Sequence, residues 1–468
     1  MTETAFEFRR TRRSTTIALA LLLMATNARA EPTASRDLTR PILTNSDAAQ
    51  YSESNGTMDR QAFREPRGAL PLREALALAL VQNPGLAAFS WETRARESEA
   101  LQAGLFPNPQ ISVEAENFAG NGSFNGYDSA ETTVMLGQLV ELGGKRPKRR
   151  QVAELERDLA DWDFEVARLN VLTAVTQNFV TVLEAQRRLE LADDLRKLAL
   201  ESLEAVSKRV EAGAASAVEQ MRADVILSSS EVAKRRAEAA LEAARASLAA
   251  LWGSPSATFD IAVGDLDTID ALPPIEPTES LIARNPDIAR WASERAHRDA
   301  VVTLESARGI PNVTVQGGVR QFESGSDTAL VLGFSVPFPV FDRNQGARQA
   351  ARSRQSKARS QQHAATTRVL RDLEVSIQAL RASYDTVIAL RTRVLPQAEK
   401  AYSGVRTGYL RGLFRYVDVL DAQRTLFELR NNELSELGQF HRAIADVERL
   451  SGTPIRNESA IPGARETK

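Results

Sequence analysis

Two long stretches of the chain repeat apolar residues with the period of an α-helix. From about residue 148 to residue 211 the sequence contains neither proline nor glycine, and apolar residues recur every three or four positions. At about 1.5 Å per residue, a helix of that length spans roughly 95 Å. An alanine-rich run over residues 217–251 follows a short turn at Ala212–Ala215. The pattern therefore predicts a long antiparallel helical hairpin.

The second half of the chain carries the same pattern. Helical periodicity covers about residues 345–406 and again 416–450, with Gly408–Gly412 between them. Pro396 lies inside the outgoing helix, where a missing N–H group predicts a kink. On pattern alone, a soluble antiparallel coiled coil fits these helices equally well.

Four shorter segments have the pattern of β-strands: the first and third alternate apolar and polar residues, and the second is mostly apolar and β-branched. They cover residues 110–116, 132–142, 313–320 and 328–336, and polar or glycine-rich loops separate the members of each pair. We expect strands of about 9–12 residues, which suits tilted strands that cross a bilayer. Two soluble hairpins are the alternative. Inside a membrane, four strands would leave two unpaired edges, so several chains would have to share one barrel.

The two halves are related by an internal duplication. Asn83-Pro84 recurs as Asn285-Pro286, and Pro107-Asn108 recurs as Pro311-Asn312, in the same order relative to the predicted elements. Each half reads as helix, two strands, long helix, tight turn and long helix. We assign residues 69–275 to the first repeat and residues 276–453 to the second, with an irregular tail over 454–468.

The first residues have the features of a secretory signal. Four arginines at positions 9, 10, 12 and 13 precede a short apolar run, and Ala28-Arg29-Ala30 has the spacing of a cleavage site. We therefore expect a signal peptide over residues 1–30 and an extended polar segment over 31–68. A short membrane anchor is the alternative. No later segment has about 18 consecutive apolar residues, so the sequence predicts no transmembrane helix after residue 30.

The composition excludes several kinds of partner and of chemical site. The formal net charge is −2, which gives no reason to expect a nucleic-acid partner, and there is no cysteine to carry a disulfide, a thiolate metal site or a lipid anchor. The only histidines are His297, His363 and His441. We interpret them as exposed helix residues rather than metal ligands. No catalytic, cofactor-binding or metal-binding motif is present, so we expect no enzyme activity and no cofactor.

Several motifs together resemble the TolC-like outer-membrane efflux factors over about residues 68–453. They are Asn83-Pro84, Gly143-Gly144-Lys145-Arg146, Phe341-Asp342-Arg343-Asn344, and the stretch from Tyr409 to Gln423. The resemblance implies an α+β fold in which four strands per chain form a trimeric 12-stranded β-barrel, continuous with a long periplasmic α-helical barrel. The second and third motifs look most like the CzcC-type branch, which serves heavy-metal cation pumps.

The same resemblance assigns roles near the helical tips. Asp418 and Asp421 lie three residues apart and share one helix face, and in a trimer they would form the periplasmic gate and selectivity ring. Tyr409 and Glu219 match a gate latch. At the position of the family's latch arginine this chain has Phe414, and Arg415 is the next residue. Arg415 is therefore expected either to contact Glu219 or to pair with Asp418. Gly213 and Gly412 would form the tip turns.

The sequence therefore predicts a passive outer-membrane duct of an efflux system of the resistance-nodulation-division (RND) type, for divalent heavy-metal cations. The expected partners are two further copies of the chain, a periplasmic adaptor (membrane fusion) protein, an inner-membrane RND pump and outer-membrane lipid. A multidrug or type I protein export duct of the same fold is one alternative. A periplasmic coiled-coil structural protein is another.

Overall fold

The computed structural model describes residues 65–269, 282 and 285–452 of the 468-residue chain. The chain divides into two compact units, and every described residue belongs to the second, Leu43–Lys468. The expected signal peptide, most of the expected extended segment and the expected tail lie outside the described residues.

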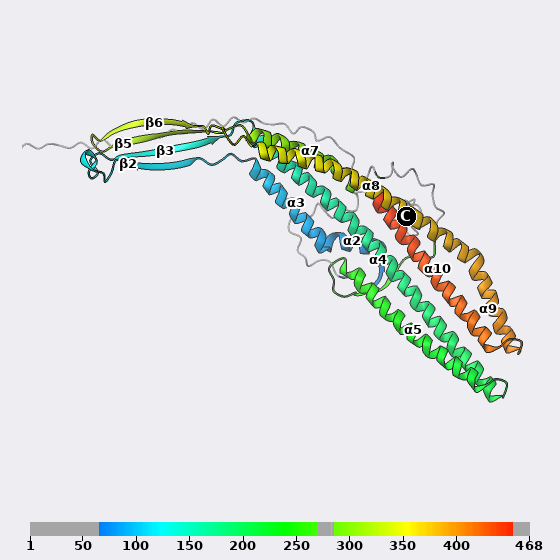
Figure 1. The fold of residues 1–468 in the computed structure, drawn as a ribbon. Coiled ribbons are helices and arrows are strands. Elements are labelled where there is room, and N and C mark those ends of the chain that lie inside the picture. The colour runs from blue at the N-terminus through cyan, green and yellow to red at the C-terminus, as the bar shows by residue number, and fades with distance from the viewer. Residues whose placement is uncertain (1–64, 270–281, 283–284, 453–468) are drawn as a thin grey trace, which may run out of the picture. The chain divides into compact units, whose positions relative to one another are not determined.

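The first half of the chain contains two helices, two long strands and a long helical hairpin (Figure 1), with a short strand before and after them. Its elements, in order, are β1 (Gly68–Pro71), α2 (Leu72–Gln82), α3 (Pro84–Ala103), β2 (Gln110–Glu116), β3 (Glu131–Val140), α4 (Lys145–Glu211), α5 (Ala217–Ala250) and β4 (Phe259–Val263).

The second half repeats the central part of that order. Its elements are α7 (Pro286–Arg308), β5 (Val313–Phe322), β6 (Asp327–Ser335), α8 (Gln345–Ala389), a π-helical turn (Leu390–Val394), α9 (Leu395–Leu410) and α10 (Tyr416–Ser451). The order predicted from the sequence is confirmed in both halves.

The four bilayer-length strand segments form one antiparallel sheet in the order β2-β3-β5-β6. Pairing of β3 with β5 runs from Glu131 opposite Phe322 to Val140 opposite Val313, so the two halves are joined along ten residue pairs. Strands β3, β5 and β6 have 10, 10 and 9 residues, but β2 has only seven and is shorter than expected. Strands β2 and β6 are the two edges, and neither has a second neighbour among the described strands.

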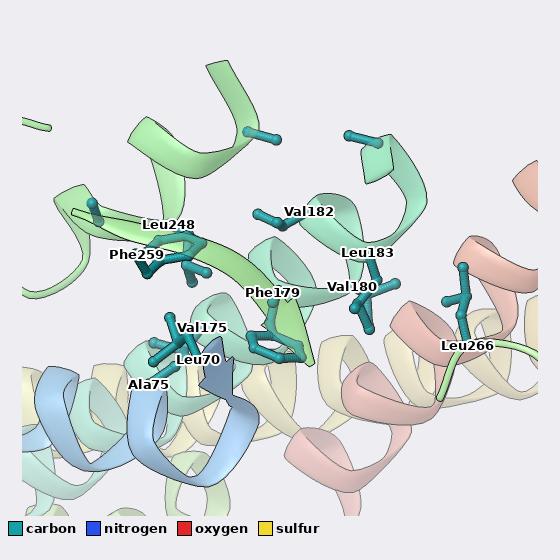
Figure 2. Packing of buried hydrophobic residues seen from close by; sticks show 14 of the residues in the cluster. Leu70, Ala75, Val175, Phe179, Val180, Val182, Leu183, Leu248, Phe259 and Leu266 are labelled. Atoms are coloured by element: carbon teal, nitrogen blue, oxygen red, sulfur yellow. The ribbon is translucent and has the colours of Figure 1, made fainter. Parts of the chain in front are cut away.

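Helix α4 is the central element of the helical part. It packs against α2, α3, α5, α7 and α10. Its Val175 and Phe179 join Leu70, Leu248 and Phe259 in the largest buried apolar cluster (Figure 2). Among the described helices, α4 alone is long and apolar enough to cross a membrane by length and composition. That is weak evidence for a span, and Val175 and Phe179 of this helix pack in the buried cluster.

The Asn-Pro motif begins a helix in both halves, and in the first half it also ends α2. The side chain of Asn83 accepts a hydrogen bond from the Leu86 N–H at 2.9 Å and donates one to the Leu251 carbonyl oxygen at 2.7 Å. Asn285 does the same, accepting from the Asp287 N–H at 2.7 Å and donating to the Leu450 carbonyl oxygen at 2.8 Å. Each asparagine thus caps a helix and fixes the end of its hairpin's return helix.

The Gly-Gly-Lys-Arg motif forms the corner between β3 and α4. Gly143 and Gly144 have φ angles of +71° and +65°, in the region that favours glycine. The buried Lys145 ammonium donates to the Ile310 carbonyl oxygen and, at 2.5 Å, to Asn312 Oδ1. At the equivalent corner in the second half, Asn344 has a φ of +57° and donates to the Glu305 carbonyl oxygen at 2.8 Å. These motifs therefore tie each strand-to-helix corner to the end of α7.

The structure corrects the predicted elements in three places. Helix α4 begins at Lys145 rather than about 148, because Pro147 fits the first turn of a helix, where no N–H partner is needed. The predicted kink is a π-helical turn over Leu390–Val394, immediately before Pro396. The parallel pair β1-β4 was not predicted, because each strand has five residues or fewer and its partner is far away in sequence.

Candidate functional site

The two helical hairpins end in similar tight turns. Gly213 lies between α4 and α5 with a φ of +70°, and Gly412 lies between α9 and α10 with a φ of +77°. A Cβ atom at either position would meet nothing within 4 Å, so the backbone conformation, not crowding, requires glycine. Both glycines thus lie at the helical tips at which the sequence placed them.

A hydrogen bond joins the two hairpins near these turns. The Tyr409 hydroxyl, at the end of α9, donates to Glu219 Oε2 in the first turn of α5 at 3.1 Å. Arg209 of α4 donates to the Tyr409 carbonyl oxygen at 3.1 Å, and its guanidinium carbon lies 4.6 Å from the centre of the Tyr409 ring. Arg209 also donates to the Ala214 carbonyl oxygen at 3.3 Å. One arginine therefore contacts both the tyrosine of the neighbouring hairpin and the turn of its own hairpin.

Tyr409 belongs to a buried cluster that packs the hairpins together. The cluster comprises Val206, Ala223, Tyr409, Tyr416 and Val419. The rings of Tyr409 and Tyr416 are 5.5 Å apart. Burial, and then the Glu219 carboxylate, raise the pKa of Tyr409. Burial is also the largest cause that raises the pKa of Tyr416, to about 12, with smaller effects from Tyr409, Tyr402 and Glu219. Both hydroxyls are therefore protonated at neutral pH.

Each aspartate of the acidic pair on α10 has an arginine of the same chain beside it. The Arg415 N–H donates to Asp418 Oδ2 at 2.9 Å, and the Arg415 guanidinium lies 3.5 Å from Asp418 Oδ1. Arg424 lies 2.9 Å from Asp421 Oδ1. Of the two contacts left open for Arg415, the structure contains the one with Asp418. Asp418 and Asp421 share the first turns of α10, and Asp421 is largely exposed, with 69% of its side chain accessible.

The interface between the hairpins contains polar atoms without partners. Within the described residues, the hydroxyl groups of Tyr402 and Tyr416 and the Nε atom of Arg209 are buried and make no hydrogen bond. Leaving such groups unpaired costs about 1–3 kcal/mol each. An interface that carries this cost separates more easily than a fully satisfied one.

The four-stranded sheet has one apolar face. Residues paired across the strands share a face, and on this one Ile111 and Val113 of β2 lie beside Leu136 and Val134 of β3. Leu330, Leu332 and Phe334 of β6 continue the face and are 83–88% exposed. A soluble protein does not keep such a row of bare leucine and phenylalanine side chains in water.

The opposite face of the same sheet is polar. Arg320 of β5 lies 2.7 Å from Glu131 of β3 and 3.1 Å from Glu116 of β2, and it donates to the Thr133 hydroxyl at 2.9 Å. The sheet therefore has the two-faced character of a wall with lipid on one side and water on the other.

The histidines differ from expectation. His363 is exposed, but His297 is buried on α7 with its Nε2 atom 3.2 Å from Glu156, and His441 is buried on α10 with its Nε2 atom 2.9 Å from the Leu266 carbonyl oxygen. Our interpretation of all three as exposed was wrong for these two, because each finds a polar partner on a packed neighbour. Among the described residues, no group of three or more His, Asp or Glu side chains is placed to hold a metal ion.

Sequence reasoning missed Arg209 and Tyr416. Arg209 stands in the last turn of α4, where a basic side chain interacts favourably with the helix dipole, and that position alone gave no reason to single it out. Tyr416 did carry a signal, because Tyr402, Tyr409 and Tyr416 are spaced seven residues apart.

Three comparisons with known proteins bear on this arrangement. The model of the outer membrane efflux protein family matches residues 75–254 and again 278–453. The cobalt-zinc-cadmium resistance protein CzcC of Cupriavidus metallidurans is 33% identical over 405 residues, which cover 86% of this chain and 95% of that protein. The nickel-cobalt-cadmium resistance protein NccC of Alcaligenes xylosoxydans xylosoxydans is 28% identical over 300 residues, or 64% of this chain and 67% of that protein.

Among solved structures, a crystal structure of CusC superposes with a TM-score of 0.72. The superposition covers 82% of this chain and 92% of that chain at 17% sequence identity. At this identity the match establishes the fold: an α+β arrangement of the TolC-like channel type.

Proposed function

Because the chain belongs to the outer membrane efflux protein family, we propose that it is the outer-membrane duct of a tripartite, RND-type efflux system. The observation that carries this proposal is the two-faced sheet. Its apolar face bears leucine and phenylalanine side chains that are more than four-fifths exposed, and its polar face bears the Arg320 cluster. A sheet of this kind is stable when lipid covers one face and water the other.

The duct is a homotrimer in this proposal. Strands β2 and β6 each leave one edge unpaired among the described strands, and unpaired backbone groups in a bilayer cost several kcal/mol each. Three copies, each with the four strands of the sheet, would close a 12-stranded barrel in which β2 of one copy pairs with β6 of the next. Helix α4, with 67 residues, would then extend roughly 100 Å into the periplasm.

The hairpin tips form the gate in this proposal. The Tyr409–Glu219 hydrogen bond and the Arg209 contacts hold the α9-α10 hairpin against the α4-α5 hairpin. Separation of the hairpins would break these contacts and widen the mouth. Asp418 and Asp421 would then line the passage, and a ring of carboxylates attracts cations.

Divalent heavy-metal cations are the proposed cargo. Support comes from CzcC and NccC, whose names describe resistance to cobalt, zinc, nickel and cadmium. A duct needs no tight metal site, because cargo must leave as readily as it enters. Selection of the metal would then fall to the inner-membrane pump and the periplasmic adaptor.

Growth of a deletion strain tests the cargo. The strain is plated on cobalt, zinc, cadmium, nickel, copper and silver salts, beside common drugs and detergents. Sensitivity to divalent metals, restored by the wild-type gene, is the expected result. Sensitivity to drugs alone would contradict the metal cargo and leave the duct in place.

A further inference from the structure

One stretch of α8 and of the loop before it is strongly basic. From Arg343 to Arg371 the sequence contains eight arginine or lysine residues and no aspartate or glutamate. The neighbouring helix α7 is balanced over its whole length, with four basic residues (Arg290, Arg295, Arg298, Arg308) and four acidic ones (Asp287, Glu294, Asp299, Glu305). The excess of positive charge is therefore a property of this stretch and not of α7.

Six of these basic side chains are exposed and unpaired. Within the described residues they make no ion pair and no side-chain hydrogen bond, unlike Arg371, which pairs with Asp372 at 2.6 Å. The six are Arg348, Arg352, Arg354, Lys357, Arg359 and Arg368. Like charges three or four residues apart destabilise an isolated helix. Such a cluster is stable when an anionic environment compensates it.

The six side chains form two stripes on opposite flanks of α8. The face that packs on α7 contains Ala351, Ala358 and Gln355, which hydrogen-bonds to Asp299 of α7. At about 3.6 residues per turn, Arg348, Arg352 and Arg359 lie roughly a quarter-turn to one side of that face. Arg354, Lys357 and Arg368 lie roughly a quarter-turn to the other side.

The face opposite α7 carries small, exposed residues. They include Ser353, Ser356, Ser360 and Ala364, which permit close approach of another helix. In a closed ring of helices, each helix has a neighbour on two sides, the lumen on a third and the periplasm on the fourth. If α7 is one neighbour and the next copy of the chain is the other, the two stripes face the lumen and the periplasm.

From this arrangement we infer that a basic belt lines the duct near its membrane end and attracts small inorganic or carboxylate anions. This inference rests on the proposed trimeric duct. It holds whichever stripe turns inward, because both stripes contain three basic side chains. Three side chains from each of three copies give nine positive charges in one belt. A charged ring between low-dielectric walls concentrates counter-ions in its lumen.

The belt has the opposite charge to the proposed carboxylates at the tips. A cation that leaves through the duct would pass Asp418 and Asp421 first and the basic belt afterwards. The belt would hold mobile anions that neutralise the cation's charge along the way.

Ion selectivity in planar lipid bilayers tests the inference. The full-length processed protein is reconstituted, and the reversal potential is measured across a tenfold KCl gradient near 10 mM, where the screening length is about 30 Å. Two triple variants are compared with the wild type. One is Arg348→Gln, Arg352→Gln, Arg359→Gln, and the other is Arg354→Gln, Lys357→Gln, Arg368→Gln. Glutamine keeps the helix propensity, and each variant is the matched control for the other.

One triple variant is expected to raise the potassium-to-chloride permeability ratio by about twofold or more, while the other leaves it unchanged. Oligomer formation in detergent, expected for all three proteins, verifies that the variants fold. Pores with the same ratio in all three proteins would overturn the inference, as would equal changes in both variants. Failure of every protein to form pores would contradict the proposed duct itself, and the inference with it.

Discussion

At the scale of single residues, the contact between the two hairpins depends on few atoms. The Tyr409 hydroxyl is the one group on α9 that reaches a carboxylate on α5 in the described structure. A net contribution of about 1 kcal/mol from such a bond would shift a closed-to-open equilibrium about fivefold. A gate needs a contact of this size, since a much stronger one would not release.

Replacement of Tyr409 by phenylalanine removes this hydrogen bond and keeps the ring in the cluster. We expect the open probability in planar bilayers to rise about fivefold. Tyr402→Phe is the matched control, because the Tyr402 hydroxyl is buried and has no partner within the described residues. Equal behaviour of the two variants would contradict the role of Tyr409 as a latch.

Neutralisation of the tip carboxylates tests the proposed selectivity ring. Asp418→Asn with Asp421→Asn removes two negative charges per chain, leaves Arg415 without its acidic partner, and leaves Arg424 with Glu428 at 3.9 Å. The variant is expected to leak more and to lose block by multivalent cations, without loss of the oligomer. Unchanged conductance and unchanged block in bilayers would rule out that role.

Tyrosine ionisation predicts how the hairpin contact depends on pH. The pKa of Tyr416 is raised to about 12 in the folded protein, above about 10 for an unfolded tyrosine. Its contribution to stability is therefore fully present below about pH 10 and is lost as the pH rises through about 12. Thermal unfolding between pH 9 and pH 12 should show this loss. Tyr416→Phe should show a smaller loss, and an identical profile would disprove the assignment.

Functional residues could be predicted from the sequence where a motif determines their position. They could not be predicted where only the packing of distant helices determines it. The spacing of Gly213 and Gly412 placed both turns, and the family resemblance paired Tyr409 with Glu219, which lie within hydrogen-bonding distance in the structure. Arg209 escaped notice because only the folded hairpins bring it to Tyr409. The burial of His297 and His441 depends on partners more than 100 residues away, which no local pattern reveals.

At the scale of elements, the corner between β3 and α4 decides how the strands lead into the helices. Gly143 and Gly144 both have positive φ angles, but their surroundings differ. A Cβ atom at Gly143 would meet Ile310 Cδ1 at 2.7 Å, whereas at Gly144 the nearest atom is Pro147 Cγ at 3.8 Å. Substitutions at these two positions therefore distinguish the effect of backbone strain from the effect of a steric clash.

Alanine at each corner glycine gives a matched pair. Both variants should lose about 1 kcal/mol through backbone strain. Gly143→Ala should lose about 1–3 kcal/mol more, because Ile310 must move. The temperature of oligomer dissociation measures the difference. A variant at Gly144 that is as unstable as the one at Gly143 would show that the contact with Ile310 is unimportant.

The helices were predicted well from the sequence because their periodicity extends over many turns. The ends of α5 and α10 lie within one residue of expectation. Alternation predicted β2 with the bounds that the structure gives, Gln110–Glu116, and the ends of β3, β5 and β6 lie within two residues of expectation. The register of β3 with β5 needed the structure, because those strands are about 180 residues apart and the sequence offers no turn that sets their alignment.

At the scale of the whole molecule, the central claim is that several copies share one barrel. The claim follows from two exposed sheet edges and from an apolar face that water does not tolerate. The duplication explains how one chain supplies two similar hairpins to the same wall. The number of copies and the pairing of β2 with β6 of an adjacent copy are properties of the assembly and not of a single chain.

The most direct test of this claim is electron cryo-microscopy of the protein extracted from outer membranes and placed in lipid nanodiscs. We predict a particle of three copies with one continuous barrel, in which β2 of each copy pairs with β6 of the next. The side chains of Leu330, Leu332 and Phe334 should face the lipid. A monomer or dimer, or a particle whose four-stranded sheets remain separate and face water on both sides, would contradict the account.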